Sequence, residues 1–258
     1  MTNLPLEPMR YFILENPDSV EQSAVIQGSD ARHIKHVLRL KPGDRIGLSD
    51  GRGMTFDAAI EAFLPDGVKV RVLSRRISAA ESPVYIMVAQ SFLKDRKMDV
   101  LIRHITELGI SKWMPFYAER SVPRHNKRRL ASRIERWKKI SREALKQCKR
   151  GRVIEIEPVP SLQEVFLVGQ GCDLKIIFWE DQEAPVDIGH IAQQFSSIQR
   201  IITVLGPEGG FSKEEIEAAE AHGFLFASLG PRILRAETAT IAAVSLLQYL
   251  FGDMGKKS

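Results

Sequence analysis

The apolar positions of the first 75 residues come in short runs, and turn-forming residues separate these runs. Asp50-Gly51 and Asp66-Gly67 are dipeptides typical of tight β-hairpin turns. Strands are therefore expected at residues 11–14, 24–27, 45–48, 55–63 and 68–73. This pattern predicts a small β-rich module, a barrel, over residues 1–76. The small and polar residues 78–83 fit a linker after it.

One helix is expected to interrupt these strands. Asp30 is the expected N-cap, and Ile34, Val37 and Leu38 fall on one helical face. The Lys-Pro-Gly triplet at residues 41–43 is expected to end the helix.

From residue 84 onward, longer apolar runs alternate with segments of helical periodicity. Strands are expected at residues 84–89, 112–117, 174–179, 201–205 and 224–229. Between the first two, apolar residues recur at helical spacing from Met98 to Leu108, and Gly109 is the expected C-cap. The alternation predicts an α/β domain over residues 83–258, with a mainly parallel sheet covered by helices.

Residues 126–150 are expected to form one long helix with a basic surface. Residues 120–152 carry 14 basic and 2 acidic side chains, a net charge of +12, although the whole chain carries only +5. Residues 153–258, with 7 basic and 15 acidic side chains, carry −8. A single apolar stripe at steps of three or four residues is formed by Leu130, Ile134, Trp137, Ile140, Ala144 and Cys148.

A solvated helix face is one explanation of this basic surface. Two acids cannot neutralise 14 bases by pairing along the helix, however, so the like charges repel one another. A polyanion would supply the missing charge, and nucleic acid is the usual one. The aromatic Trp137 lies on the apolar stripe, so this helix is expected to hold the phosphate backbone without stacking on bases.

Cysteine content and hydropathy predict the cellular compartment in which the protein works. Cys148 and Cys172 are too few for a disulfide framework and favour a reducing environment, and neither has neighbours at metal-ligand spacing, so no metal is expected. Residues 1–10 contain no apolar run of a signal peptide, and the most apolar stretch, residues 241–251, is too short to span a bilayer. A cytoplasmic protein that does not bind membranes is expected.

Two glycine-bearing loops follow predicted strands near the C-terminus. Residues 206–210, Gly-Pro-Glu-Gly-Gly, precede a helix that the Ser212 and Glu215 capping box begins. Neither a Walker loop nor a dinucleotide-binding motif is present there, and a tight connection remains an alternative. Residues 230–239 lead into an apolar helix, which is expected to be buried on every side.

The second loop carries Arg232, Arg235 and Glu237, which are expected close to the core. Unpaired charges would be costly there, so the arginines are expected to hold carboxylates or a ligand, with a structural Arg–Glu pair as the alternative. Ligands in open α/β sheets bind at the carboxyl ends of the strands, where both loops lie.

Together, LGPEGGFSKEEI at residues 205–216 and SLGPRILRAETA at residues 228–239 resemble the C-terminal signature of the RsmE-type 16S rRNA uridine-N3 methyltransferases, a family of the SPOUT superfamily. The resemblance runs over almost the full length. Residues 10–12 and 33–44 are similar to the family's N-terminal RNA-binding barrel, and residues 94–109 to its first catalytic-domain helix. Two positions depart from the pattern, His104 in place of a lysine and Ile154 in place of a proline.

The resemblance implies a PUA-like barrel at residues 1–76, a SPOUT methyltransferase domain at residues 83–258 with a trefoil knot near residues 200–245, and a homodimer. It implies S-adenosyl-L-methionine (AdoMet) as the cofactor and the 16S rRNA of the small ribosomal subunit as the partner. The residues expected to line the cofactor are Leu205, Gly206, Glu208, Gly209, Gly210, Leu229, Gly230, Ile233, Leu234 and Thr238.

Methyl transfer to N3 of uracil requires loss of the N3 proton and stabilisation of negative charge on the base. Arg235 and Arg232 are the candidates for stabilising that charge. Glu237 and Glu107 are the candidate general bases, although pairing with an arginine would make Glu237 a poor base. The residues expected to contact RNA are Arg10, Arg39, Arg124, Lys127, Arg128, Arg129, Arg133, Arg136, Lys146 and Arg150.

Two other functions remain open from the sequence. A non-catalytic RNA-binding or ribosome-assembly protein could use the basic helix and the barrel, but it would not need two cofactor loops. Another SPOUT enzyme could methylate a different RNA target, such as a ribose 2′-hydroxyl or a guanine.

Overall fold

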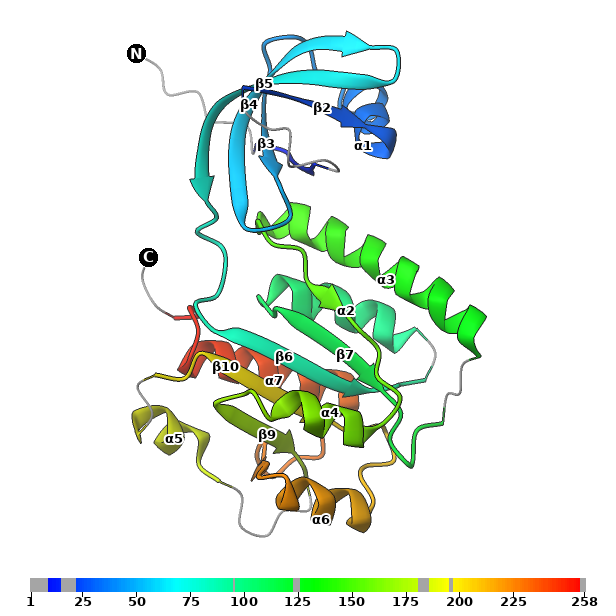
Figure 1. The fold of residues 1–258 in the computed structure, drawn as a ribbon, viewed down its shortest axis with the longest axis vertical. Coiled ribbons are helices and arrows are strands. Elements are labelled where there is room, and N and C mark those ends of the chain that lie inside the picture. The colour runs from blue at the N-terminus through cyan, green and yellow to red at the C-terminus, as the bar shows by residue number, and fades with distance from the viewer. Residues whose placement is uncertain are drawn as a thin grey trace. The chain divides into compact units, whose positions relative to one another are not determined.

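The computed structural model describes residues 9–14, 22–94, 96–122, 126–180, 186–194 and 197–255 (Figure 1). The chain divides into two compact units. The first comprises Met1–Glu81 and Arg142–Val153, and the second comprises Ser82–Ser141 and Ile154–Ser258. No helix in these described ranges combines the length and the apolar character that crossing a membrane requires.

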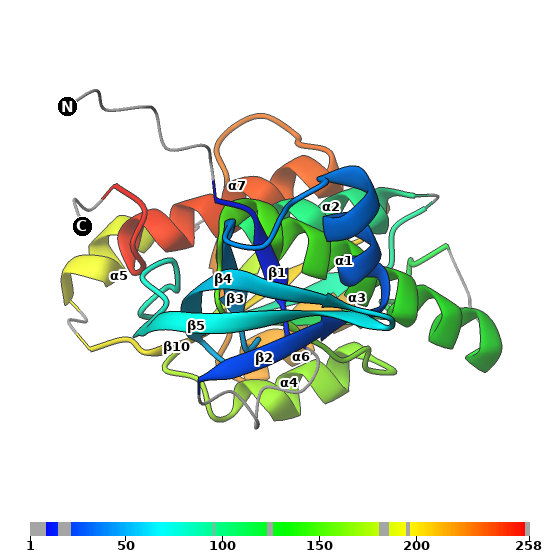
Figure 2. The same ribbon diagram turned by 90° about the horizontal axis from the view of Figure 1, so that it is seen from above.

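The first unit contains a five-stranded sheet with the order β1-β3-β4-β5-β2. The strands are β1 (Tyr11–Ile13), β2 (Ser23–Gln27), β3 (Arg45–Ser49), β4 (Met54–Leu64) and β5 (Gly67–Ile77). Neighbouring strands are antiparallel except β1 and β3, and Figure 2 shows β4, β5 and β2 side by side. The strands and hairpin turns expected from the sequence are confirmed. Among the described residues no ladder joins β1 to β2, so closure into a barrel stays a prediction.

The helix of the first unit differs from the expected one. It begins at Gly28 as α1 (Gly28–Arg32) and continues as a π-helix, η2 (His33–Val37), so Asp30 lies in the first turn and is not the N-cap. Each π turn takes in one extra residue and rotates the following side chains around the axis. For this reason Ile34 is fully buried but Val37 is 66% exposed, contrary to the sequence prediction.

A buried ion pair joins the two stretches of chain that make up the first unit. Arg150, whose side chain is 3% exposed, donates from Nη2 to Oε2 of Glu81 over 2.8 Å. The other carboxylate oxygen of Glu81 accepts from the backbone amides of Gly151 at 2.7 Å and Arg152 at 2.9 Å. Glu81 therefore fixes residues 150–152 to the end of the segment that follows β5.

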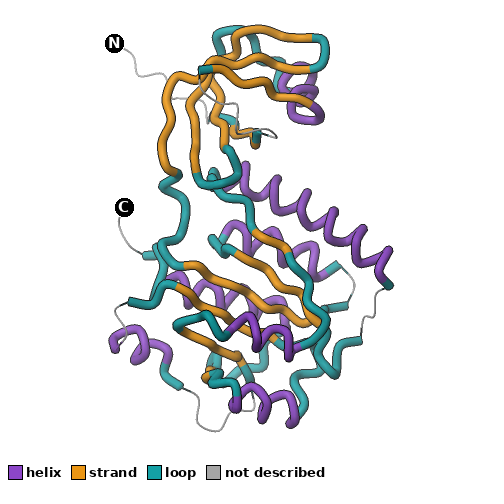
Figure 3. The backbone as a smooth tube through the Cα atoms, in the orientation of Figure 1, coloured by secondary structure: helices purple, strands orange, loops and turns teal. Residues whose placement is uncertain are grey.

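The second unit is built on a six-stranded sheet with the order β11-β9-β10-β6-β7-β8, in which every pair is parallel. The strands are β6 (Tyr85–Ser91), β7 (Lys112–Phe116), β8 (Glu155–Ile156), β9 (Leu174–Phe178), β10 (Arg200–Leu205) and β11 (Leu225–Ala227). The helices are α2 (Lys97–Glu107), α3 (Lys127–Cys148), α4 (Leu162–Gly169), α5 (Ile188–Gln194), α6 (Lys213–Ala221) and α7 (Ala236–Leu250), and α3 belongs to the first unit from Arg142 onward. The predicted strands and their parallel arrangement are confirmed, and the two-residue β8 is too short to have produced a pattern (Figure 3).

Side chains alternate between the two faces of this sheet, and both faces are covered. Ile86 and Val88 of β6 point into one apolar core, which α2, α5, α7 and Trp137 of α3 complete. Met87 and Ala89 point into a second core, which α4 and α6 complete (Figure 1). Burial on both faces explains why these strands are apolar throughout their length.

The basic helix α3 is attached to the second unit along its apolar stripe. Trp137 is fully buried, and its Nε1 donates to Oδ1 of Asp99 on α2 over 3.0 Å. Oδ2 of the same carboxylate accepts from Nε of Arg136 at 2.8 Å. At the start of the helix, Oδ1 of Asn126 accepts from the backbone amide of Arg129, which caps the first turn.

Helix α7 is buried on one face only, so the expectation that it is buried on every side is wrong. Ala243, Val244 and Leu247 are fully buried, whereas Tyr249 is 61% exposed. The helix packs as an outer layer on one face of the sheet, against β10 and α2.

Replacing Glu81 with alanine leaves the Arg150 charge buried without its carboxylate. Because removal of one partner of a buried pair costs about 3–5 kcal/mol, we expect Glu81→Ala to lower the free energy of unfolding by that amount. Urea denaturation followed by circular dichroism measures it. Glu61→Ala, which removes an exposed partner of Lys69, is the control and should cost less than about 1 kcal/mol. Equal losses for the two variants would contradict a structural role for the buried pair.

Candidate functional site

A cavity of about 330 Å³ lies at the carboxyl edge of the sheet in the second unit. The loop after β10 and the loop before α7 form two of its sides, and Phe178 at the end of β9 forms another. Its lining is partly apolar, with Phe178, Leu205 and Phe211, and partly charged, with Lys97 and Arg235. In parallel sheets this edge is where ligands usually bind.

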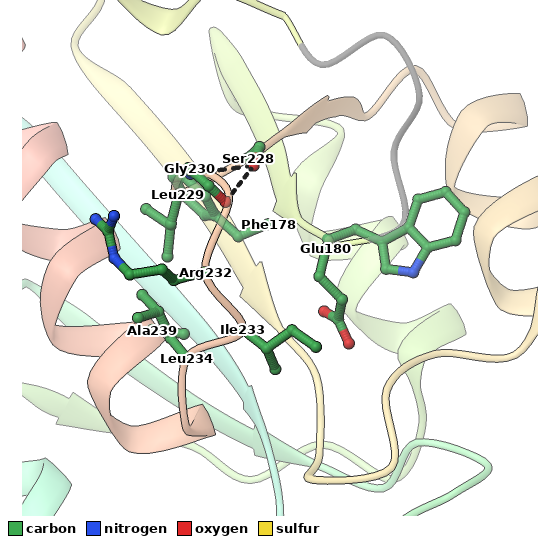
Figure 4. A pocket seen from close by; sticks show the side chains of 10 residues that line it. Phe178, Glu180, Ser228, Leu229, Gly230, Arg232, Ile233, Leu234 and Ala239 are labelled. Atoms are coloured by element: carbon green, nitrogen blue, oxygen red, sulfur yellow. Dashed lines mark hydrogen bonds between the residues drawn. The ribbon is translucent and has the colours of Figure 1, made fainter.

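A second cavity adjoins the first. Five residues line both cavities, and they are Phe178, Glu180, Ile233, Leu234 and Ala239. Figure 4 shows Glu180 and Ile233 facing the same space, while the guanidinium of Arg232 extends away from Glu180. We call the two cavities together the loop cleft.

Glycine is required at two turns of the loop cleft because their backbone is left-handed. Gly210 has φ +68 and Gly230 has φ +96, a region that other residues enter only with strain. At Gly206 the limit is space, since a Cβ atom would come within 3.1 Å of the Phe211 ring. Both loops therefore keep their backbone open toward the cleft.

A buried amide joins the two loops. The Gln90 side chain, at the end of β6, is fully buried, and its Nε2 donates to the carbonyl oxygens of Ser91 at 3.1 Å and Gly206 at 3.2 Å. Its Oε1 accepts from the hydroxyl of Thr240 on α7. Gln90 thus fixes the first loop to the helix that follows the second. Gln90 was not predicted as a site residue from the sequence, although a polar residue at the carboxyl end of an apolar strand is the signal that could have identified it.

An ion-pair cluster joins the loops from the other side. Nζ of Lys97, on the first turn of α2, lies 3.0 Å from Oε1 of Glu208 and 3.3 Å from Oε2 of Glu237. The hydrogen bond to Glu208 is the largest cause of a raised pKa of Lys97. Burial works against ionisation of Glu208, but hydrogen bonds from its own amide, from Lys97 and from the Lys94 amide hold its pKa below the ordinary value. Lys97 and Glu208 are therefore both charged at neutral pH.

The candidate catalytic residues do not lie where the sequence analysis expected them. Arg232 and Arg235 are exposed and not close to the core, and among the described residues neither forms an ion pair. Glu237 pairs with Lys97 and not with an arginine. The reason is that α7 begins only at Ala236, so residues 230–235 form a surface loop. Arg235 lines the larger cavity of the loop cleft and Arg232 the smaller one.

Glu107, the other candidate base, lies outside the loop cleft. It is the last residue of α2, ten residues after Lys97, which corresponds to about 15 Å along a helix. Its carboxylate lies 3.7 Å from Nδ1 of His104.

Eight of the ten residues expected at the cofactor line the loop cleft. They are Leu205, Gly206, Glu208, Gly210, Leu229, Gly230, Ile233 and Leu234. Gly209 lies to the side, where its carbonyl accepts from Arg120 at 3.2 Å, and Thr238 is exposed on the first turn of α7. The lining residues that the sequence analysis did not name include Lys97, Phe178, Glu180 and Phe211.

The residues expected at RNA fall into two groups. Exposed side chains are those of Arg10, Arg39, Lys127, Arg128, Arg129 and Arg136, and Arg133 is half-buried. Lys146 and Arg150 are held by carboxylates inside the first unit, Lys146 by Asp30 and Glu143, and Arg150 by Glu81. Arg124 lies outside the described residues.

Comparison with known proteins adds independent information. A model of an RNA methyltransferase domain matches residues 80–248, and a model of an RNA methyltransferase PUA domain matches residues 26–73. Ribosomal RNA small subunit methyltransferase E of Bacillus subtilis is 30% identical over 93% of this chain and 96% of its own.

Solved structures agree with these sequence matches. Ribosomal RNA small subunit methyltransferase E of Neisseria gonorrhoeae, bound to S-adenosyl methionine, has a TM-score of 0.82 and 28% identity over 96% of this chain and all of its own. A Legionella pneumophila protein solved with the cofactor SAM has a TM-score of 0.83 and 30% identity over the same shares. By sequence and by fold, this chain belongs to the RNA methyltransferase family that includes the ribosomal RNA small subunit methyltransferase E proteins.

Proposed function

We propose that this protein is an AdoMet-dependent enzyme that methylates N3 of a specific uridine in the 16S rRNA of the small ribosomal subunit. The observation that carries the proposal is the loop cleft, formed by two glycine loops that Gln90 and Lys97 hold together. A protein that only binds RNA has no use for such a cleft. The named relatives that act on small subunit rRNA support the substrate.

The residues of the loop cleft fit AdoMet. Open glycine backbone at Gly210 and Gly230 allows close approach of the adenosine part, and Phe178 and Leu205 give its flat base an apolar surface. Glu180 lines both cavities and is placed to accept hydrogen bonds from hydroxyl or amino groups. When bound, AdoMet supplies an electrophilic methyl group on a sulfonium sulfur.

Arg235 is the residue we assign to the reacting base. Loss of the N3 proton leaves negative charge on the uracil oxygens, and a guanidinium at the cleft stabilises that charge. Arg235 is exposed at the rim and carries no carboxylate partner among the described residues, so its charge is available. Glu237, with its carboxylate on Lys97, instead orders the start of α7.

The basic helix α3 is proposed to hold the RNA backbone. Exposed Lys127, Arg128 and Arg129 form its first turn, and no acidic residue lies there. Phosphate contacts of this kind position RNA without reading its sequence. The PUA domain that precedes the methyltransferase domain is proposed as a further RNA-binding surface.

The proposal includes the remaining expectations from the family. They are domain limits at residues 1–76 and 83–258, a trefoil knot near residues 200–245, a homodimer and a cytoplasmic location. Exposed apolar side chains around the second loop and α7 support the homodimer, since Ile233 is 88% exposed and Tyr249 is 61% exposed.

The proposed reaction predicts a specific change in ribosomal RNA. Deleting the gene should remove 3-methyluridine from 16S rRNA, and the purified protein with AdoMet should restore it, as measured by mass spectrometry of nucleosides. An unchanged level of 3-methyluridine together with loss of another methylated nucleoside would assign the enzyme a different target. Absence of AdoMet binding in calorimetry, with or without RNA, would favour the non-catalytic alternative.

Arg235→Ala should slow methyl transfer with little effect on cofactor binding. Loss of one charge-stabilising donor typically lowers kcat by about 10²–10³. We therefore expect a loss of that size in single-turnover transfer of labelled methyl groups, with the AdoMet Kd changed less than about twofold. Arg103→Ala, which removes an exposed arginine on α2, is the matched control and should be close to wild type. A larger loss for Arg232→Ala would transfer the role to that residue.

Gln90→Leu should weaken AdoMet binding although Gln90 itself does not line the loop cleft. The substitution leaves the partly buried Gly206 carbonyl and the fully buried Thr240 hydroxyl without the Gln90 amide, and an unsatisfied buried group costs about 1–3 kcal/mol. We expect the AdoMet Kd in calorimetry to rise by about tenfold or more. The control is Thr203→Val in β10, because the buried hydroxyl of Thr203 has no hydrogen-bond partner in the described structure. Equal affinities for Gln90→Leu and wild type would rule out the positioning role.

A further inference from the structure

A separate cavity of about 590 Å³ lies within the first unit. It is formed by the beginning of the described chain, by α1 and η2, and by the last turns of α3. Neither the methyltransferase loops nor any other part of the second unit contributes to its lining. We call it the Tyr11 cavity.

Some of the cations around the Tyr11 cavity are paired with carboxylates of the protein, and others have no ion-pair partner among the described residues. Nζ of Lys146 lies 2.7 Å from Asp30 and 2.9 Å from Glu143, with only 16% of its side chain exposed. Burial opposes ionisation of Lys146, but the two carboxylates outweigh it and raise its pKa. Lys146 therefore works as an internal cross-link between α1 and α3. Arg10 and Lys149, which also line the cavity, are exposed and have no ion-pair partner among the described residues.

One strained backbone position lies at this cavity, at Lys149. Among the described residues the two non-glycine positions with positive φ are Lys149, at φ +63, and Arg39, at φ +52. Lys149 follows the C-terminus of α3, a position where glycine is the usual residue. Strained non-glycine residues concentrate at functional sites, as do π-helices such as η2, which brings His33 to the cavity. A lysine in a position that favours glycine indicates that its side chain is used.

Tyr11 gives the cavity an aromatic wall. Tyr11 pairs with Gly47 in the ladder between β1 and β3, and a Cβ on Gly47 would fall 2.7 Å from the Tyr11 ring. The ring therefore lies against bare backbone, which fixes its orientation. Tyr11 is half-buried and is one of the residues that line the cavity.

We infer that the Tyr11 cavity binds one single-stranded nucleotide of the RNA substrate, with the base on Tyr11 and the phosphate on Arg10 and Lys149. An aromatic ring beside unpaired cations is the combination that recognises single-stranded nucleic acid, and the volume lies in the range of ligand pockets. The inference rests on the proposed function and adds a second contact point to it, because the site lies outside the loop cleft.

Binding of a fluorescein-labelled RNA decamer of alternating uridine and cytidine, which forms no duplex, tests the site in the full-length protein. Base stacking contributes about 1–3 kcal/mol per base, so Tyr11→Leu should raise the Kd about tenfold, while Tyr11→Phe should bind like wild type. Removing both cations in Arg10→Ala/Lys149→Ala should lower the slope of log K against log salt by about 1.4. The control Lys69→Ala/Lys213→Ala removes equal charge at exposed sites and should leave the slope unchanged.

Lys149→Gly separates a binding role from a structural one. Glycine relieves the left-handed strain, so the melting temperature should rise while RNA affinity falls. Unchanged RNA affinity in this variant and in Tyr11→Leu would overturn the inference.

AdoMet calorimetry and methyl transfer, run on the same proteins, keep this inference distinct from the proposed function. If Tyr11→Leu and Arg10→Ala/Lys149→Ala bind RNA normally while methyl transfer is present, the proposed nucleotide site in the Tyr11 cavity is refuted and the proposed function is not. If the Tyr11-cavity variants bind RNA more weakly but the wild-type protein transfers no methyl group, the proposed enzymatic function is refuted and the nucleotide site is supported.

Discussion

The geometry of the loop cleft depends on two contacts that no single loop could provide. Gln90 fixes the Gly206 carbonyl and the Thr240 hydroxyl from inside the sheet, and Lys97 binds Glu208 and Glu237 at the surface. Glycine loops have little stiffness of their own, because glycine has no Cβ atom and its backbone can adopt more conformations than that of other residues. Anchoring both loops to β6 and α2 transfers the rigidity of the parallel sheet to a backbone that must stay open toward a ligand.

Different side chains of the site hold the two loops in place and face a ligand. The anchoring residues are buried or neutralised, so they are occupied by the protein itself. The residues proposed to act on a substrate, such as Arg235 and Glu180, stand at the rim without carboxylate or ammonium partners in the described chain. A charged side chain that serves the fold is paired, and one that serves a ligand is exposed. The expectation that Arg232 and Arg235 would lie close to the core is wrong because residues 230–235 form an exposed loop before α7 begins.

The sequence predicted the elements better than it predicted the partners of individual side chains. Strand alternation, the capping box of Ser212 and Glu215, and the stripe through Trp137 are local signals, and the structure confirms them. The pairing of Lys97 with Glu208 and Glu237 joins residues more than 100 positions apart, and no local pattern contains it. The exposure of Val37 depends on a π turn, which shifts the helical period by one residue and has no signal in the hydrophobic spacing.

The distinction between paired and exposed side chains also applies to the basic segment, residues 120–152. Its net charge of +12 counts Arg136, Lys146 and Arg150 as free, yet the structure gives each of them a carboxylate from outside the segment, Asp99, Asp30 and Glu81 respectively. These pairs hold α3 in place, and the cations that stay exposed include those of its first turn, Lys139, Arg142 and Lys149. The phosphate backbone is therefore expected to run along the exposed cations of α3 and not past Lys146 and Arg150, which carboxylates already hold. The carboxylates of Asp99, Asp30 and Glu81 thus limit which cations of α3 are available for the proposed RNA contacts, although none of them needs to touch RNA.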